Sequence, residues 1–397
     1  MFLSPSGQLG GAETSLLEIL ASLREARPAW PLHLLIAGEG PLQARAASLG
    51  VATATLPFAP SIARLGETRA MSEGRHPGFV VKLAMAAAPI AAYIRHLRRV
   101  VREIGPDILH TNGLKMHVLA AQARVRPRLV WHLHDYVGSR AMSARLLRWS
   151  RPRCSAVIAN STSVADDVRK TLAGVRVVTV HNAVDLCRFS PSGDRLDLDE
   201  LAGLDPAEPG TVRIGLVGTF ARWKGHETFL NAVARLPRDA PIRAYVVGDA
   251  VYETEGSQYS RGELTDLVRR LNIGHRVGFT GFVARPEAAL RTLDIVVHAS
   301  TNPEPFGLVI VEAMASGRPV VVSLTGGAAE IVTDGVNALG HPPGNVERLA
   351  ARLTELALDP ALRARIGRAG RATAERDFDR QRLARELVPL YQSVVES

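Results

Sequence analysis

Short β-branched runs alternate with helical stretches along all 397 residues of the chain. This alternation predicts βαβ units, in which crossover helices join parallel strands. In the first half we expect strands at His33–Ala37, Ile108–Thr111, Leu129–Leu133, Ala156–Ala159 and Val177–Val180. In the second half we expect strands at Val212–Val217, Ile242–Val247, Arg276–Thr280, Ile295–His298 and Pro319–Ser323. The sequence therefore predicts an α/β protein with doubly wound parallel sheets.

The length favours two domains, because 397 residues exceed the usual size of one. A segment rich in Pro, Gly, Asp and Ser separates the two series of strands. We therefore expect a first domain over residues 1–190, a linker over 191–210 and a second domain over 211–375. Residues 376–397 are expected to form a C-terminal helix that returns to the first domain. Ligands of doubly wound domains bind in the loops after the strands, so the search for a site concentrates there.

The first such loop contains Gly10 and Gly11 and comes directly before a helix that opens with Glu13. Glycines allow the backbone to approach a ligand closely, and a helix N-terminus favours an anion. The alternative is a plain turn between a strand and a helix. The loop lacks the G-x-G-x-x-G pattern, so the nicotinamide fingerprint is absent from it.

A second loop follows the run Val212–Val217 and carries Gly218, Arg222 and Lys224 just before a helix. Two cations near the start of a helix suit a diphosphate group. The alternative is a solvated pair of charges. Only four of the 48 basic residues are lysines, which favours a functional reading of Lys224.

A third loop holds Glu304 and leads into a helix that begins near Leu308. The backbone N–H groups of Gly307, Leu308 and Val309 would form an anion site at the start of that helix. Glu312 lies about one turn further along. Two carboxylates that flank an anion site fit a ligand with phosphate in the middle and hydroxyl groups on both sides. The alternative for Glu312 is a residue on the helix surface.

A fourth candidate is His134, at the end of the run Leu129–Leu133 and next to Asp135. Alternation along a strand places His132 and His134 on one face. The pair could be zinc ligands, a general base, a polar contact to a sugar or structural histidines. No third clustered ligand is evident, so we expect no metal site.

The formal charge of +9 at pH 7 comes almost entirely from arginine. Four explanations are open for this charge: a coding bias toward arginine, phosphorylated substrates, an anionic membrane or nucleic acid. Nucleic acid is disfavoured, since aromatic residues make up 5% and no nucleic-acid-binding motif occurs. The stretch Phe79–Arg102 combines apolar residues with five cations, a pattern typical of interfacial helices. The cations are Lys82, Arg95, Arg98, Arg99 and Arg102. We therefore expect contact between the first domain and anionic membranes, with an ordinary packed helix as the alternative.

The N-terminus shows no secretory pattern, and the longest apolar run, Leu83–Ile94, is too short to span a bilayer. Cys154 and Cys187 show no metal-binding spacing, and a reduced compartment fits them. We therefore expect a cytoplasmic protein, in contact with the inner face of the membrane if the basic stretch binds lipid.

Together these segments resemble family 4 of the retaining glycosyltransferases, whose GT-B fold has two Rossmann-like domains that face a deep cleft. The resemblance covers nearly the whole chain, and its most specific part is the E-x7-E motif from Glu304 to Glu312. The family usually has Asn-Gly where this chain has Asn182–Ala183. The matching segments are Gly10–Glu13, His134–Asp135, Asn160–Ser161, His181–Phe189, Arg222 with Lys224, and Glu304–Glu312.

The resemblance implies a nucleotide-diphosphate sugar as donor. Arg222 and Lys224 would neutralise its diphosphate, Glu304 would hold hydroxyls of the sugar, and Glu312 would hold the ribose. His134 would lie beside the reacting sugar. The implied catalytic residues are His134, Arg222, Lys224 and Glu304. The implied donor-binding residues are Gly10, Gly11, Gly218, Gly307, Leu308, Val309 and Glu312, with Glu13, Asn160 and Ser161 as weaker candidates.

In such enzymes no side chain is an agreed nucleophile, and the leaving phosphate is thought to take the acceptor proton on the same face. Catalysis is then mostly positioning and charge stabilisation. Fixed cations would replace a metal ion, so the resemblance implies no cofactor. The acceptor would be a glycan, a lipid-linked sugar or a small molecule. The alternatives are a GT-B epimerase or phosphorylase, or a non-catalytic subunit that binds nucleotide sugars.

Overall fold

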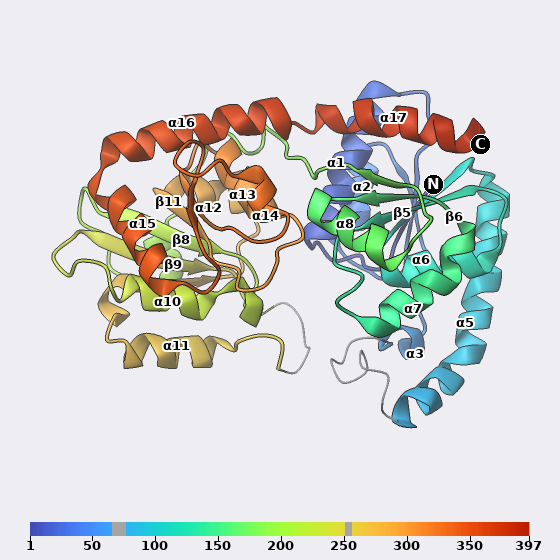
Figure 1. The fold of residues 1–397 in the computed structure, drawn as a ribbon, viewed down its shortest axis with the longest axis horizontal. Coiled ribbons are helices and arrows are strands. Elements are labelled where there is room, and N and C mark those ends of the chain that lie inside the picture. The colour runs from blue at the N-terminus through green and yellow to red at the C-terminus, as the bar shows by residue number, and fades with distance from the viewer. Residues whose placement is uncertain (66–76, 251–255, 397) are drawn as a thin grey trace. The chain divides into compact units, whose positions relative to one another are not determined.

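The computed structural model describes residues 1–65, 77–250 and 256–396, with the backbone alone for 77–84 (Figure 1). The described chain divides into two compact units. Unit 1 contains residues 1–183 and 380–397, and unit 2 contains residues 184–379. The cleft expected between the two domains remains a prediction.

Unit 1 is built on a parallel sheet whose described strands have the order β3-β2-β1-β4-β5-β6-β7. Its central strands are buried on both faces and carry aliphatic residues together with the buried polar residues His110, Thr111, Asn112 and His132. The strands are β1 Phe2–Ser4, β2 His33–Ile36, β3 Ala52–Thr55, β4 Ile108–Asn112, β5 Arg128–Leu133, β6 Cys154–Ala159 and β7 Val177–Thr179.

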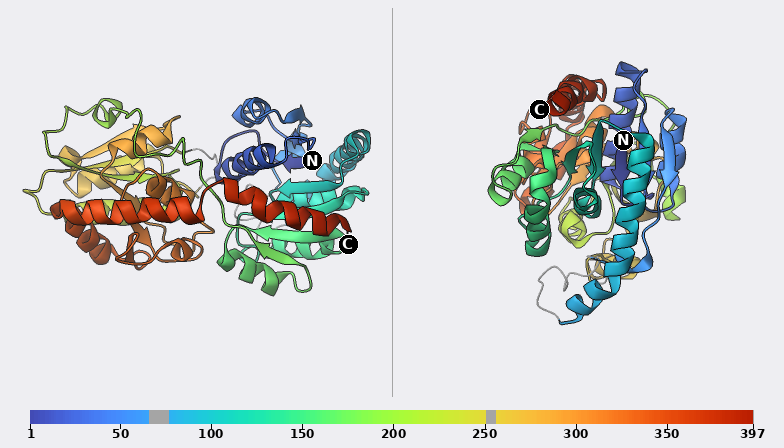
Figure 2. Two further views of the ribbon diagram at one scale, coloured as in Figure 1. Left: turned by 90° about the horizontal axis from the view of Figure 1, so that it is seen from above. Right: turned by 90° about the vertical axis from the view of Figure 1, so that its right-hand side faces the viewer.

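The helices of unit 1 cover both faces of this sheet (Figure 2). The last helix, α17, packs against α1, where the backbone N–H of Ala384 donates to Ser22 Oγ at 3.0 Å. Arg380 and Glu25 form an ion pair at 2.8 Å beside the same contact. The helices are α1 Gly11–Ala26, α2 Pro41–Ser48, α3 Pro60–Ala63, α5 Pro77–Ile104, α6 Leu114–Ala123, α7 Ala141–Ser150, α8 Thr162–Thr171 and α17 Gln381–Glu396, with the 3-10 turn Arg151–Arg153.

Unit 2 repeats the architecture with a parallel sheet whose described strands have the order β10-β9-β8-β11-β12-β13. The strands are β8 Val212–Val217, β9 Ile242–Val247, β10 Val277–Gly281, β11 Ile295–His298, β12 Val320–Ser323 and β13 Leu339–His341. The helices are α9 Leu198–Ala202, α10 His226–Val233, α11 Arg261–Arg270, α12 Pro286–Thr292, α13 Leu308–Ala315, α14 Ala328–Ile331, α15 Val346–Leu358 and α16 Pro360–Asp377, with 3-10 turns at Arg222–Lys224 and Gly274–Arg276.

The segment expected to be a linker, residues 191–210, is instead packed onto unit 2. It contains α9, whose Leu198 is fully buried. The carboxylate of Asp199 accepts hydrogen bonds from Arg243 at 2.6 Å and from Tyr245 at 2.5 Å. The polar composition that reads as a linker therefore includes a buried charge network that anchors the segment.

Within the described residues, no helix combines the length and the apolar character needed to cross a bilayer. The doubly wound α/β class predicted from the sequence is confirmed by both sheets.

Candidate functional site

In each sheet the strand order reverses at one point, and ligands of doubly wound folds bind there, outside the carboxyl ends of the strands. The reversal lies between β8 and β11 in unit 2 and between β1 and β4 in unit 1. The loop after β8 carries Arg222 and Lys224, and the loop after β11 carries Glu304. The loop after β1 ends at Gly10, and Gly11 is the first residue of α1. These predicted residues therefore flank the reversal points of their own units, while His134 and Asn160 follow β5 and β6.

In unit 2 the structure joins Lys224 to Glu304. Lys224 Nζ lies 3.0 Å from Oε1 and 2.8 Å from Oε2 of Glu304. The carboxylate side chain is 7% exposed and the lysine side chain 24%, so the pair is largely shielded from water. Lys224 Nζ also lies over the Trp223 ring, 4.1 Å from its centroid. Two residues that are 80 positions apart thus form an ion pair at the carboxyl ends of β8 and β11.

Backbone contacts hold the two loops together. The N–H of Thr301 donates to the carbonyl of Trp223 at 2.8 Å. Gly225 has a φ of +77°, and a Cβ there would overlap the carbonyl oxygen of Ala299. A glycine is needed at this point, because a side chain would push the loop after β8 away from β11. The close approach of Gly225 to Ala299 therefore keeps the loops of Lys224 and Glu304 next to each other.

Glu304 is held as a carboxylate by several donors. Ser300 Oγ donates to Oε2 at 2.8 Å, and His298 Nε2 lies 3.1 Å from the same oxygen. Burial alone would raise the pKa of Glu304, but Lys224 and the contact with His298 outweigh it and hold the pKa well below its usual value. Glu304 is therefore an ionised acceptor, suited to hydroxyl groups.

Arg222 points elsewhere within the same 3-10 turn. Its Nη2 lies 2.6 Å from Glu263 Oε1, and its guanidinium lies 4.3 Å from the centroid of the Tyr259 ring. Both side chains of the Arg222–Glu263 pair are more than 40% exposed, so the pair is loosely held. Gly218, after β8, faces open space, since a Cβ there would meet no atom within 4 Å. Contact of Arg222 and Gly218 with a ligand remains a prediction.

The start of α13 provides the predicted anion site. Gly307 precedes the helix with a φ of +97°, which favours glycine. The N–H groups of Leu308 and Val309 lie in the first turn, where helix geometry offers no internal acceptor. The positive end of the helix therefore lies next to Glu304 in the chain, and the acid and the anion site adjoin.

Glu312 lies further along the same helix and is partly buried. It forms no hydrogen bond or ion pair with the residues that the structure describes. Burial raises its pKa to about 7, while Arg188 opposes this shift and Glu287 reinforces it. A shielded carboxyl group without a hydrogen-bond partner lowers the stability of the folded protein. Groups of this kind are common in binding sites, where a ligand supplies the partner.

In unit 1, His134 is linked to the glycine loop through Asn112. His134 Nε2 lies 2.5 Å from Asn112 Oδ1, and Asn112 Nδ2 donates to the carbonyl of Ala12 at 3.3 Å. Burial lowers the pKa of His134 to about 4, so the ring is neutral near pH 7. Because Oδ1 only accepts, Nε2 carries the proton. Nδ1 is a buried acceptor with no partner among the described residues.

The glycine loop differs in one respect from the sequence prediction. The backbone N–H of Gly10 donates to Glu13 Oε2 at 3.2 Å, and Glu13 thereby caps the start of α1. An acidic side chain thus already satisfies part of the helix terminus that was expected to attract phosphate. Gly11 is exposed and remains a predicted phosphate contact.

Asn160 and Ser161 follow β6, the neighbour of β5 in the sheet. Ser161 Oγ accepts the N–H of Val164 at 3.1 Å and caps α8, which is a structural role. Asn160 is buried, and its Oδ1 has no partner within the described part of the chain. Unsatisfied atoms of Asn160 and His134 therefore occur at the ends of adjacent strands.

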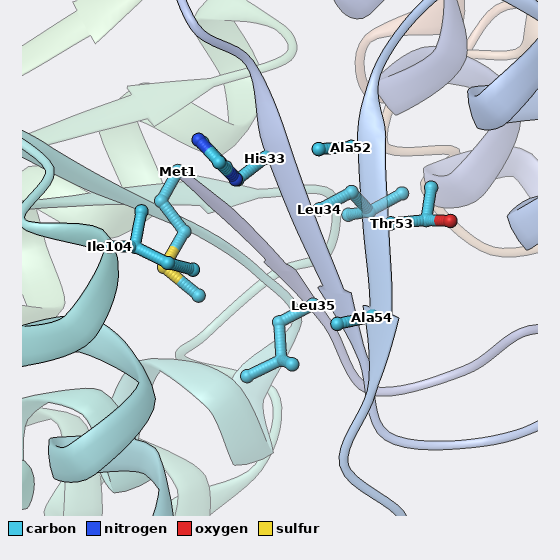
Figure 3. Close-up of a pocket in the computed structure, with 8 residues that line it drawn as sticks. All are labelled: Met1, His33, Leu34, Leu35, Ala52, Thr53, Ala54 and Ile104. Carbon is cyan, nitrogen blue, oxygen red and sulfur yellow. The ribbon is translucent and has the colours of Figure 1, made fainter.

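A cavity of about 60 Å³ in unit 1 lies away from these loops (Figure 3). Its walls come from Met1, from β2 and β3 and from the end of α5, and they include His33, Leu35, Thr53 and Ile104. Most of the lining is aliphatic, and the volume is far below the several hundred Å³ of typical ligand sites. We assign no role to it.

Sequence reasoning did not identify Asn112, His298 or Ser300. Asn112 and His298 are the last residues of β4 and β11, and Ser300 lies two residues after β11. Asn112 contacts His134 after the neighbouring strand, while His298 and Ser300 contact Glu304 in the same loop. The only signal was the placement of polar residues at the ends of otherwise apolar strands. Such residues could have been selected by the same strand-end rule that selected His134.

Two family models together match most of the chain. The model of glycosyltransferase family 4 matches residues 9–188, and that of glycosyl transferases group 1 matches residues 206–373. The chain therefore belongs to the group 1 and family 4 glycosyltransferases, in agreement with the resemblance seen in its motifs.

Particular relatives support this assignment. The D-inositol 3-phosphate glycosyltransferase of Streptomyces avermitilis is 35% identical over 229 residues, which cover 55% of this chain and 48% of the relative. The match thus spans about half the length of that relative. The crystal structure of Anabaena Alr3699/HepE in complex with UDP-glucose is 27% identical, with 99% of this chain and 98% of that chain covered and a TM-score of 0.78. Sucrose-phosphate synthase from Thermosynechococcus elongatus is 20% identical, with 99% of both chains covered and the same TM-score of 0.78, which shows the shared GT-B fold.

Proposed function

We propose that this chain is a retaining, metal-independent glycosyltransferase that moves a sugar from a nucleotide-diphosphate donor onto a glycan, a lipid-linked sugar or a small molecule. The observation that carries the proposal is the Lys224–Glu304 ion pair beside the start of α13. The HepE relative was crystallised with UDP-glucose, which makes UDP-glucose the first donor to test.

The proposed donor lies along unit 2 with its diphosphate at the start of α13. The N–H groups of Leu308 and Val309 face the phosphates, and Glu304 accepts hydrogen bonds from hydroxyls of the sugar. Glu312, which has no partner among the described residues, accepts hydrogen bonds from the ribose. Glu304, the start of α13 and Glu312 then match the sugar, the diphosphate and the ribose in their order along one nucleotide sugar.

Lys224 has the central electrostatic role in this proposal. Two hydrogen bonds to Glu304 leave one of the three ammonium donors for a phosphate oxygen. Charge on the leaving diphosphate grows as the glycosidic bond breaks, so a fixed cation stabilises the transition state more than the ground state. The departing phosphate oxygen then takes the proton of the acceptor hydroxyl on the same face of the sugar, and the configuration is retained.

In unit 1, we infer that His134 contacts the reacting sugar as a neutral ring with Nδ1 as acceptor. Asn160 offers a second buried acceptor near the end of the neighbouring strand. The exposed Gly11 remains the proposed phosphate contact of this unit. These assignments follow the family resemblance and the unsatisfied atoms described above.

Incubation with UDP-glucose without an acceptor tests the reaction class. A retaining transferase that uses water as acceptor releases UDP and, initially, α-glucose, which NMR detects before mutarotation. An epimerase would convert the sugar on the nucleotide. A glycosyl phosphorylase would leave UDP-glucose unchanged and would release sugar 1-phosphate only from a glycan supplied with phosphate. Binding without turnover, with or without candidate acceptors, would favour the non-catalytic subunit.

A further inference from the structure

A buried polar triad lies at the carboxyl end of β11. His298 is the last residue of the strand and 3% exposed, and Ser300 is fully buried. His298 Nε2 lies 3.1 Å from Ser300 Oγ and 3.1 Å from Glu304 Oε2. Ser300 Oγ donates to the same Oε2 at 2.8 Å. Lys224 approaches this oxygen from the neighbouring loop, so three donors converge on it.

The contacts define the proton on His298. Glu304 is an ionised acceptor, and Ser300 uses its own proton toward the carboxylate. Both groups that face Nε2 therefore accept, and Nε2 carries the proton and shares it between them. Nδ1 is buried and has no partner in the part of the chain that the structure describes.

This arrangement is unfavourable for stability alone. Burial of an unsatisfied ring nitrogen costs free energy, and the other residues of β11 are aliphatic. A leucine at position 298 would continue the apolar core without that cost. The polar contact of His298 Nε2–H with Glu304 Oε2 offsets that cost and adds a third donor, beside Lys224 and Ser300, at one carboxylate oxygen.

We propose that His298 is a positioning residue that, together with Ser300, fixes the Glu304 carboxylate in the orientation that receives the hydroxyls of the donor sugar. The inference rests on the proposed function, because it assigns Glu304 to the sugar end of the donor. The inference predicts that His298 contributes to the affinity for the sugar of the donor and not to the affinity for the nucleotide.

Calorimetric titrations with UDP and UDP-glucose measure the two parts separately. The affinity ratio of UDP-glucose to UDP reports the contribution of the sugar. His298→Leu should lower this ratio about tenfold or more and leave the affinity for UDP unchanged. His298→Gln should recover much of the loss, because its amide places a donor near the position of Nε2. Ser300→Ala should lower the ratio in the same direction without altering the histidine.

Controls separate positioning from folding. Thr373→Val changes another buried polar side chain of unit 2, on α16, and should leave the ratio unchanged. Equal losses of UDP and UDP-glucose affinity in His298→Leu, or no loss in a folded His298→Leu, would overturn the inference. If the wild-type chain bound neither probe, the proposed use of a UDP-sugar would fail first, and the inference with it.

Discussion

The ammonium of Lys224 bridges both carboxylate oxygens of Glu304, at 3.0 and 2.8 Å, although the two residues belong to different loops of unit 2. The bridge keeps Glu304 ionised despite its burial. Removal of Lys224 would therefore leave Glu304 as a buried carboxylate without its cation, and removal of Glu304 would leave Lys224 without its anion. Variants at this pair should affect the chemical step more than those at the ribose end.

Lys224→Ala should depress kcat even with saturating donor. It removes a cation from a diphosphate whose negative charge grows in the transition state, and a preorganised donor of this kind contributes about 3 kcal/mol, or roughly a hundredfold in rate. Glu312→Ala should mainly raise the donor KM, because a ribose contact is similar in the ground and transition states. Steady-state kinetics on folded variants measures both effects.

Lys224→Arg is the matched variant for charge and should rescue only partly, because a planar guanidinium does not reproduce a compact ammonium. A Lys224→Ala enzyme with near-normal kcat at saturating donor would reduce Lys224 to a binding residue. The proposed stabilisation of the leaving group would then lose its main support.

Donor binding should depend on pH through Glu312. Its pKa is raised to about 7, so the carboxylate that accepts ribose hydroxyls is increasingly protonated below that pH. The donor KM should therefore rise as the pH falls from about 8 to about 6, by up to about tenfold per unit once the pH is below the pKa. Glu312→Gln should remove this dependence. A wild-type KM that stayed constant over this range would contradict the assignment.

The same pKa predicts a gain in stability. The pKa of Glu312 in the folded state lies above its ordinary value of 4.5. The free energy of unfolding therefore falls as the pH rises from 4.5 to about 7, because the unfolded chain ionises this group first. Glu312→Gln lacks this loss, so its Tm should exceed that of the wild type more at about pH 8 than at about pH 5. Thermal unfolding at the two pH values measures the difference, and an equal Tm difference at both would show that Glu312 does not carry the shift.

Much of the fold could be predicted because most strands are rich in aliphatic residues and alternate with helical stretches. The predicted strands Val212–Val217 and Ile242–Val247 are confirmed to the residue. Strands Ala52–Thr55 and Leu339–His341 were not predicted, because the first is largely exposed and the second has only three residues. Helix Leu198–Ala202 was hidden by the polar composition around it.

The site was predicted only as far as single loops allow. Glu304 and Lys224 could be proposed from motifs and strand ends, and the structure joins them. The contact of Asn112 with His134 and that of Arg222 with Glu263 depend on pairings between distant segments. Sequence patterns carry no direct signal for such pairings, because either residue alone reads as an ordinary polar side chain.

Turnover should persist in excess EDTA, since Lys224 supplies a fixed cation beside Glu304. The two Asp-x-Asp segments of the sequence, at 197–199 and 377–379, lie outside the loops of the candidate site. Initial rates with and without chelator, on protein purified in EDTA, measure this. Loss of turnover that Mg²⁺ or Mn²⁺ restores would show that a metal ion carries part of the charge stabilisation.

Association with anionic membranes through α5 remains a prediction, and the side chain of Lys82 lies outside the described residues. Within the described part of α5, Tyr93, Leu97 and Val101 are buried in the core of unit 1. Lipid contact would therefore depend on exposed cations, at about 1 kcal/mol for each. Arg95→Glu/Arg102→Glu should abolish flotation with phosphatidylglycerol vesicles. Flotation that did not depend on anionic lipid would leave an ordinary packed helix.

The central claim is that unit 2 binds a nucleotide-diphosphate sugar through its diphosphate. Calorimetric titration of the wild-type chain with UDP-, GDP-, ADP- and TDP-sugars, in EDTA, tests it most directly. The account predicts that at least one of them binds, that its nucleoside monophosphate binds far more weakly, and that Lys224→Ala weakens the complex. Absence of binding by every member of the panel to folded protein would contradict the account.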